Sequence, residues 1–286
     1  MASSTPWRTS ASDALARWTG YRVVRDGSHV DTLPRGRARP PLDPQDRLVP
    51  EPVFLLSSVR SGSTLLRAVL NSHSQVHSPH ETHFRRLTVV ARTPPSRQAL
   101  EADGLTLSDV DHLLWDRLLH RSLQRSGKRV LVEKTPSNVF VADRLHTAWP
   151  AARFIFLIRH PLMIARSWHA ADPAGRPMER AVEHTLAYME HLERARRRHS
   201  GITVRYEDLT ADPATQTRRL CDFLGVEWEP AMVDYGRADH GRFEAGIGDW
   251  SDRIRSGRIQ RAADLPAPED VPESLTGIAQ AWGYLA

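Results

Sequence analysis

The sequence predicts an α/β fold with three layers, in which a central parallel sheet of four to five strands is flanked by helices. Two observations lead to this prediction. Short apolar runs alternate along the chain with stretches of helical character, which is typical of a parallel sheet covered on both faces. The first run, "VFLL", enters a Gly/Ser/Thr turn and then a Leu-rich helix, as a phosphate-binding loop does.

The expected elements follow one another from residue 52 onward. The strands are expected at residues 53–58, 129–133, 153–158 and 201–206, with a short extended segment at 75–78. The helices are expected at residues 63–72, 108–124, 137–149, from 161, 178–199 and 213–224. Because ligands of such folds bind beyond the carboxyl ends of the strands, the residues after each strand are the candidates for a site.

The chain is expected to form one domain with three parts. Residues 1–50 would be an N-terminal extension, with a short amphipathic helix near residues 11–18, a possible strand "YRVV" and a Pro/Arg linker. Residues 51–235 would be the α/β core. Residues 236–286 are rich in Gly and Pro and indicate a C-terminal lid that ends in a short helix.

Composition narrows the class of partner. The formal net charge of +5 favours an anionic ligand. The sequence has no zinc-finger spacing and no basic repeat interleaved with aromatic residues, so a small polyanion fits better than a nucleic acid. Only Lys128 and Lys134 are lysines among the 39 basic residues, and this Arg-rich usage suggests a bacterial source.

The location is expected to be cytoplasmic. No apolar run reaches the roughly 18 to 20 residues that cross a bilayer, so we expect no membrane insertion. The N-terminus lacks the pattern of a secretory signal. The single cysteine, Cys221, excludes an internal disulfide framework, fits a reducing compartment and is expected to lie in the core.

The segment "VRSGSTL" at residues 59–65 carries the features of an anion-binding loop. Gly62 permits a tight turn, the neighbouring hydroxyls donate hydrogen bonds, and Arg60 supplies a full charge. The loop lacks the Gly-Lys-Ser/Thr ending that binds ATP with magnesium. Lys134, Arg159 and Arg205 follow the other strands. A ring of buried cations would be costly without an anion, which implies a polyanionic ligand.

This constellation resembles the sulfotransferases that use 3′-phosphoadenosine 5′-phosphosulfate (PAPS), most closely their bacterial and tyrosylprotein branches. The resemblance covers about residues 52–230. Its motifs are "RSGSTL" at 60–65 followed by "NSH" at 71–73 and Glu81, "EKTP" at 133–136, "RHP" at 159–161 with Ser167, and "RYEDL" at 205–209 with a helix ending "FLG".

The resemblance implies a P-loop-like fold and a set of cofactor contacts. The loop would hold the 5′-phosphosulfate through Arg60, Ser61, Gly62, Ser63, Thr64 and Leu65. Arg159 and Ser167 would bind the 3′-phosphate, and Tyr206 would lie near the nucleotide. Ser256, Gly257 and Arg258 would close over the 3′-phosphate, with Arg253 and Arg255 as alternatives. No metal is expected, because this nucleotide carries no triphosphate.

In-line transfer of a sulfuryl group needs three roles. We expect Arg60 to stabilise the leaving phosphate, Lys134 to neutralise the transferred group, and Glu81 to take the proton of the acceptor. His80 and His83 are rival bases, and Glu81 could instead be a carboxylate at a helix N-terminus. A metal site formed by His73, His77, His80 and His83 is a weaker reading, because no cysteine accompanies them.

Two other functions compete. One is a P-loop phosphotransferase or nucleoside kinase, which the missing lysine argues against. The other is a non-catalytic nucleotide-binding module. The acceptor is expected to be a hydroxyl or amine of a small secondary metabolite or a carbohydrate, bound by residues 82–127, 168–178 and 235–262. The sequence leaves the oligomeric state open.

Overall fold

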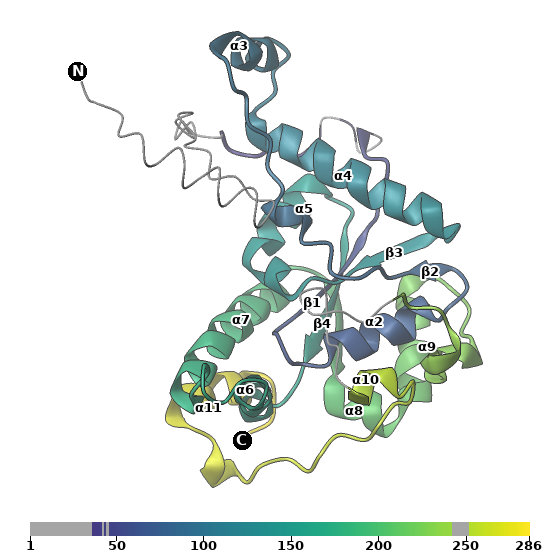
Figure 1. Cartoon of the computed structure of the whole chain (residues 1–286), viewed down its shortest axis with the longest axis vertical. Coiled ribbons are helices and arrows are strands. Elements are labelled where there is room, and N and C mark those ends of the chain that lie inside the picture. Colours follow the sequence, from purple (N-terminus) through teal and green to yellow (C-terminus); the bar gives the residue numbers. More distant parts are fainter. Residues whose placement is uncertain (1–35, 42, 44–45, 242–251) are drawn as a thin grey trace, which may run out of the picture.

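The computed structural model of the chain describes residues 36–41, 43, 46–241 and 252–286, and it contains a five-stranded parallel sheet (Figure 1). The strand order is β2-β3-β1-β4-β5. The strands are β1 (Val53–Ser57), β2 (Val76–His77), β3 (Val130–Glu133), β4 (Arg153–Ile158) and β5 (Gly201–Arg205). Helices cover both faces, so the predicted three-layer α/β fold is confirmed. The expected elements of residues 1–35, and residues 242–251 of the expected C-terminal lid, lie outside the described residues.

Alternate residues of the strands enter two hydrophobic clusters, one on each face of the sheet. Phe54 and Leu56 join one cluster, whereas Val53 and Leu55 join the other. The helices on the first face are α4 (Leu107–Ser126), α5 (Ala142–Ala148), α6 (Pro161–Ala170), α7 (Met178–Arg198) and α11 (Glu273–Ala281). Those on the second face are α2 (Ser63–Asn71), α8 (Tyr206–Ala211) and α9 (Pro213–Leu224).

Two helical regions differ from the sequence-based expectation. The segment expected as one helix at 137–149 is a 3₁₀ helix, η3 (Pro136–Val141), followed by α5. The β-branched Val139 and Val141 disfavour a regular α-helix there. Helix α3 (Pro94–Ala102) was not expected. It buries no side chain and projects from the rest of the molecule, so it lacks the apolar stripe that reveals a helix in a sequence (Figure 1).

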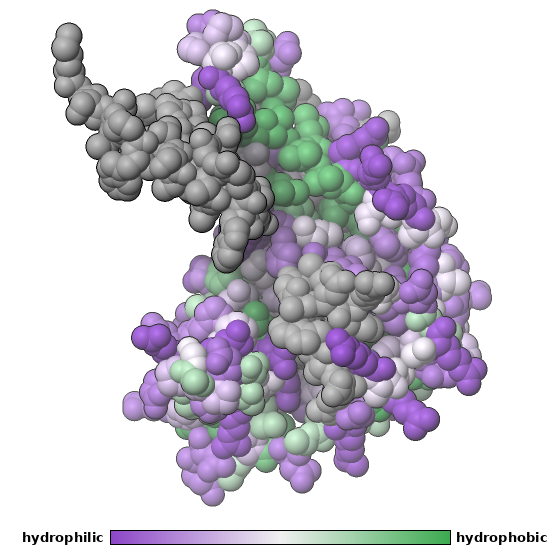
Figure 2. All heavy atoms as spheres, in the orientation of Figure 1, coloured by the Kyte–Doolittle hydropathy of each residue, from purple (hydrophilic) through white to green (hydrophobic). Residues whose placement is uncertain are grey.

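The remaining described elements are short. They are η2 (Phe84–Arg86), η4 (Pro230–Val233), η5 (Tyr235–Arg237), α10 (Asp252–Arg255) and η6 (Pro268–Asp270). Figure 2 shows a hydrophobic area over α4. The exposed apolar residues on α4 and the segment before α3 include Leu87, Val90, Leu113 and Leu118. Across the described ranges, no helix combines the length and the apolar character needed to cross a membrane.

The C-terminal helix α11 is part of the core. It lies beside α6 and α7, and Leu275, Ile278 and Trp282 belong to the cluster on that face (Figure 1). Trp282 is 3% exposed, and its Nε1–H donates to Glu193 Oε2 on α7 at 3.0 Å. The C-terminal segment is therefore packed into the hydrophobic core against α7.

Trp282→Ala is expected to lower the free energy of unfolding by about 3–5 kcal/mol, since it leaves a large cavity and removes one of the hydrogen bonds to Glu193. Chemical denaturation measures the change. Leu265→Ala, at a side chain that is 50% exposed, is the control and should change the value by less than about 0.5 kcal/mol. Equal effects of the two substitutions would contradict a core role for α11.

Candidate functional site

The loop between β1 and α2 has an unusual backbone. Arg60 has φ 60° and Gly62 has φ 89°, and both values lie in the left-handed region. A Cβ atom on Gly62 would come within 2.3 Å of the Tyr206 ring. Gly62 therefore meets two requirements at once, the left-handed conformation and the close approach of Tyr206.

The other loop residues are buried at the start of α2. Ser63 and Thr64 are 5% and 6% exposed, and the Ser61 hydroxyl donates to the Ser58 carbonyl at 2.7 Å. The Leu65 side chain belongs to the hydrophobic cluster on the α2 face. Leu65 can therefore offer a ligand only its backbone N–H group in the first turn of α2. The N-terminal N–H groups of α2 form the type of site that binds phosphate and sulfate groups.

The structure brings four predicted cofactor residues together from four different segments. Arg60 Nε donates to Ser167 Oγ on α6 at 3.2 Å. Arg159, directly after β4, donates to the Arg60 carbonyl at 2.9 Å. Its guanidinium lies 4.6 Å from the centre of the Tyr206 ring, a cation–π distance. The ends of β1, β4 and β5 thus meet around one cationic cluster.

Gly62→Ala is expected to weaken binding of adenosine 3′,5′-bisphosphate by at least tenfold, since it displaces Tyr206, and to destabilise the fold by about 1–3 kcal/mol. Calorimetric titration and thermal denaturation measure both effects. Gly127→Ala is the matched control, because Gly127 has φ 66° and open space around its Cβ position. It should lose stability but keep nucleotide affinity. Unchanged affinity in both variants would exclude a role of Gly62 in binding.

Glu81 and Lys134 form an ion pair at the end of β3. Lys134 Nζ lies 2.6 Å from Glu81 Oε1, and His83 Nε2 lies 3.4 Å from Glu81 Oε2. The Lys134 side chain is fully buried, whereas that of Glu81 is 12% exposed. Burial lowers the pKa of Lys134 from its usual value, and the Glu81 carboxylate opposes this shift.

Arg67, on α2, is a further cation near this pair. It is 1% exposed and donates to the Ser78 carbonyl at 3.1 Å. Burial lowers its pKa to about 10, and the charge of Glu81 opposes that shift. Sequence reasoning missed Arg67, which lies at an ordinary position in a Leu-rich helix. His80, one of the rival bases, faces Gly241, where an added Cβ would lie 3.2 Å from its Nε2.

Arg205 contributes to the fold rather than to the cluster around Arg60. Its guanidinium donates to the Trp282 carbonyl and lies 4.4 Å from the centre of the Tyr284 ring. The Tyr284 hydroxyl donates to Glu207 Oε2 at 2.6 Å. The expectation that Arg205 joins a ring of ligand-binding cations therefore needs correction, because this arginine holds the end of α11.

Ser256, Gly257 and Arg258 lie against the turn at η5. Gly257 has φ 69°, and its carbonyl accepts from the Gly236 N–H at 3.1 Å. A Cβ on Gly257 would lie 2.6 Å from Gly236 Cα, so backbone packing explains this glycine. The Tyr235 hydroxyl contacts the Arg258 carbonyl at 3.3 Å. A role of this segment at the 3′-phosphate stays a prediction.

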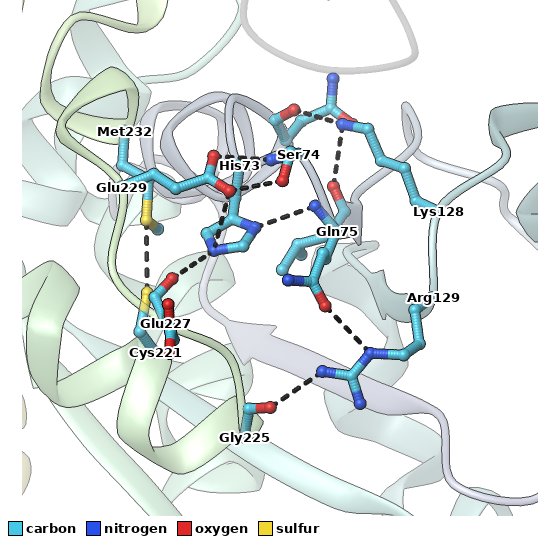
Figure 3. A network of polar contacts seen from close by, with 12 residues as sticks. His73, Ser74, Gln75, Lys128, Arg129, Cys221, Gly225, Glu227, Glu229 and Met232 are labelled. Carbon is cyan, nitrogen blue, oxygen red and sulfur yellow. Dashed lines mark hydrogen bonds and ion pairs between the residues drawn. The ribbon is translucent and has the colours of Figure 1, made fainter.

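The histidines of residues 73–83 have separate surroundings. His73 Nε2 contacts the Glu227 carbonyl at 2.7 Å, and its Nδ1 accepts from the Gln75 N–H at 2.9 Å (Figure 3). His77 Nε2 lies 2.8 Å from Ser122 Oγ. In the described part of the chain, no group of three or more His, Cys, Asp or Glu side chains could hold a metal ion.

The other lysine and the cysteine have structural surroundings. Lys128 Nζ donates to the carbonyls of Asn71 and Val76 at 2.7 and 3.1 Å (Figure 3). Cys221 is buried, as expected, and burial raises the pKa of its thiol to about 11. A cavity of about 410 Å³ between β2 and α4 is lined by His77 and by residues 118–126 of α4, which fall in the segment predicted to bind the acceptor. None of the predicted cofactor-binding residues lines it.

The structure is thus an α/β protein with a glycine-containing loop between the carboxyl end of β1 and the N-terminus of α2. A model described as "Sulfotransferase family" matches residues 52–230. The chain therefore belongs to the sulfotransferase family, and the predicted resemblance is confirmed.

Two curated relatives agree with this assignment. The nodulation protein NoeE of Sinorhizobium fredii is 26% identical over 216 residues, which cover 63% of this chain and 51% of NoeE. Protein-tyrosine sulfotransferase 2 of Gallus gallus is 24% identical over 206 residues, which cover 64% of this chain and 53% of that protein. This chain spans about half the length of these relatives.

Two solved structures have the same P-loop-like fold. The sulfotransferase domain from the curacin biosynthetic pathway has a TM-score of 0.59 at 23% identity, covering 82% of this chain and 98% of that chain. The sulfotransferase domain from the olefin synthase of Synechococcus has a TM-score of 0.57 at 23% identity, covering 87% and 97%.

Proposed function

We propose that this protein transfers the sulfuryl group of PAPS to a hydroxyl or amine of a small-molecule or carbohydrate acceptor and releases adenosine 3′,5′-bisphosphate. The observation that carries the proposal is the contact of 2.6 Å between Glu81 and Lys134. It places a carboxylate and a cation at the end of β3, which is paired with the strand that carries the anion-binding loop. A base and a cation that neutralises the transferred group are two of the three roles that in-line transfer requires.

The donor would bind at the ends of β1 and β4. The loop from Arg60 to Leu65 would surround the 5′-phosphosulfate, with N–H groups of α2 as donors. Arg159 and Ser167 would bind the 3′-phosphate, with Tyr206 beside the nucleotide. The hydrogen bond of 3.2 Å between Arg60 and Ser167 links these two subsites and supports one continuous nucleotide site.

The reaction then divides among three residues. Glu81 takes the proton as the acceptor oxygen or nitrogen bonds to sulfur. The bond from sulfur to the phosphate oxygen breaks, and its electron pair stays on the phosphate, where Arg60 offsets the charge. Lys134 offsets the charge on the oxygens of the transferred group. In the structure Lys134 is paired with Glu81, which keeps the proposed base and the proposed cation side by side.

The acceptor would approach from the side of residues 82–127. This segment follows Glu81 directly and carries the exposed apolar residues Leu87, Val90, Leu113 and Leu118. An acceptor with an apolar portion beside its hydroxyl or amine fits this surface. The chain's +5 charge further supports an anionic donor.

Incubation with ³⁵S-labelled PAPS and a panel of hydroxyl and amine acceptors tests the proposal. Transfer should proceed in the presence of EDTA, and adenosine 3′,5′-bisphosphate should bind without a metal. Magnesium-dependent binding of ATP would instead support a phosphotransferase. Nucleotide binding without transfer to any acceptor of the panel would support the non-catalytic alternative.

A further inference from the structure

Glu133 is a buried carboxylate that sequence reasoning did not single out. It is the last residue of β3, directly before Lys134, and it is fully buried. Its Oε1 accepts from Thr82 Oγ1 at 2.7 Å and from Thr135 Oγ1 at 2.6 Å. Its Oε2 accepts from Asn138 Nδ2 at 2.6 Å. A carboxylate is buried at low cost only where such donors surround it.

These hydrogen bonds hold the segment that carries Glu81. Thr82 is bound directly, and the His83 N–H donates to Thr135 Oγ1 at 3.4 Å. His83 has φ 48°, a left-handed conformation that costs free energy for a residue other than glycine. Such a conformation persists only where its surroundings hold it, and Glu133 is the common acceptor of the groups that do so.

The same carboxylate supplies charge next to Lys134. The charged groups that act on Lys134 are Glu81 from the segment after β2, Arg67 from α2 and Glu133 from its own strand. When Glu81 takes a proton from the acceptor, Lys134 loses its nearest counter-charge. The carboxylate of Glu133 then remains as the negative charge beside this cation.

We propose that Glu133 is a positioning residue for sulfuryl transfer: its buried carboxylate anchors residues 81–83 to the end of β3 and so holds Glu81 against Lys134. This inference rests on the function proposed above. It assigns to Glu133 no contact with donor or acceptor.

Three substitutions test whether the hydrogen bonds of Glu133 position residues 81–83 or only stabilise the fold. Thr82→Val removes one hydrogen bond to Glu133 and keeps its charge, whereas Thr82→Ser restores the hydroxyl. Glu133→Gln removes the charge and keeps the size. Asn138 Oδ1 has no hydrogen-bond partner among the described residues, so a turned Asn138 amide can accept from the new Gln side chain.

Asp116→Asn is the matched control away from the site. Asp116 is 2% exposed and, like Glu133, accepts three hydrogen bonds. They come from the N–H groups of Leu48 and Val49 and from Trp149 Nε1. Loss of this carboxylate lowers stability without touching residues 81–83.

Thr82→Val and Glu133→Gln are expected to lower kcat by about 10- to 100-fold, because a displacement of about 1 Å can cost that much. Affinity for adenosine 3′,5′-bisphosphate should stay within about twofold, and Thr82→Ser and Asp116→Asn should keep kcat within about twofold of the wild type. A wild-type kcat in Thr82→Val, or an equal loss in Asp116→Asn, would overturn the proposal.

A second readout does not depend on turnover. The chain has only two lysines, so ¹³Cε-lysine labelling gives two side-chain NMR signals, and Lys128→Arg assigns them. The Lys134 signal should move in Thr82→Val and Glu133→Gln and stay in place in Asp116→Asn. An unmoved signal in the first two variants argues against the anchor. If the Lys134 signal moves in these variants but the wild-type protein transfers no sulfuryl group, the structural role of Glu133 is retained and the proposed function is wrong.

Discussion

Glu81→Gln is expected to lower kcat by about 10²- to 10⁴-fold, the range for loss of a general base. The neutral amide keeps the size of the side chain and can still accept a hydrogen bond from Lys134, so the fold and the nucleotide site should persist. Affinity for adenosine 3′,5′-bisphosphate, measured by calorimetry, should change less than about twofold. Steady-state transfer from labelled PAPS measures kcat.

Glu229→Gln is the control for this substitution. Glu229 also lies near a histidine, with 3.7 Å between its Oε1 and His73 Nε2, and it accepts from the Ser74 N–H at 2.8 Å (Figure 3). Its replacement should lower the melting temperature and leave kcat in place. If Glu81→Gln transfers at the wild-type rate while His83→Ala does not, the base is His83.

Lys134→Met is expected to lower kcat by about 10²- to 10³-fold, because it removes the charge that we propose to stabilise the transferred group. The pH dependence follows from the same residue. Because burial lowers the pKa of Lys134, the cation loses its proton at a lower pH than an exposed lysine does. Activity of the wild type should therefore decline on the alkaline side before pH 10.5, the ordinary lysine value.

Lys128→Met serves as the control, since Lys128 is the other lysine and binds only backbone carbonyls in the described structure. It should destabilise the turn after α2 and keep both kcat and the alkaline decline. Lys134→Arg keeps the positive charge but changes the shape of the side chain. A planar guanidinium does not fit the fully buried site of Nζ, so this variant shows whether charge alone is enough for activity. Full activity of Lys134→Met would remove this lysine from the mechanism.

The sequence predicted most of the sheet because apolar strands are local patterns. β4 lies at residues 153–158 and α9 at residues 213–224, as expected. The loop residues and Lys134 could also be singled out, since each follows a strand of a parallel sheet. Glu81 was singled out mainly because it matches the catalytic Glu of the sulfotransferases that the sequence resembles. Helix α3 was not predicted because it buries no side chain, and a periodic apolar stripe is what reveals a helix in a sequence.

The missed features are contacts between residues far apart in the chain. Arg205 was expected to bind a ligand because it ends a strand, but it donates to the carbonyl of Trp282, 77 positions away. Thr82 and Glu133 are 51 positions apart, and their hydrogen bond exists only once β2 and β3 pair. Local propensity carries no information about such pairs, so only the folded structure shows which charged side chains already have hydrogen-bond partners within the protein.

The isolation of α3 has an evolutionary consequence. Its nine residues contribute no side chain to either core cluster, yet they lie on the connection that leaves Glu81 and returns through α4. Mutations, insertions or deletions in this excursion carry almost no folding penalty, whereas changes in β3 or α2 do. Under the function proposed above, this connection lies on the acceptor side, so its sequence can change toward new acceptors at little cost in folding, whereas residues of β3 and α2 are constrained by the core.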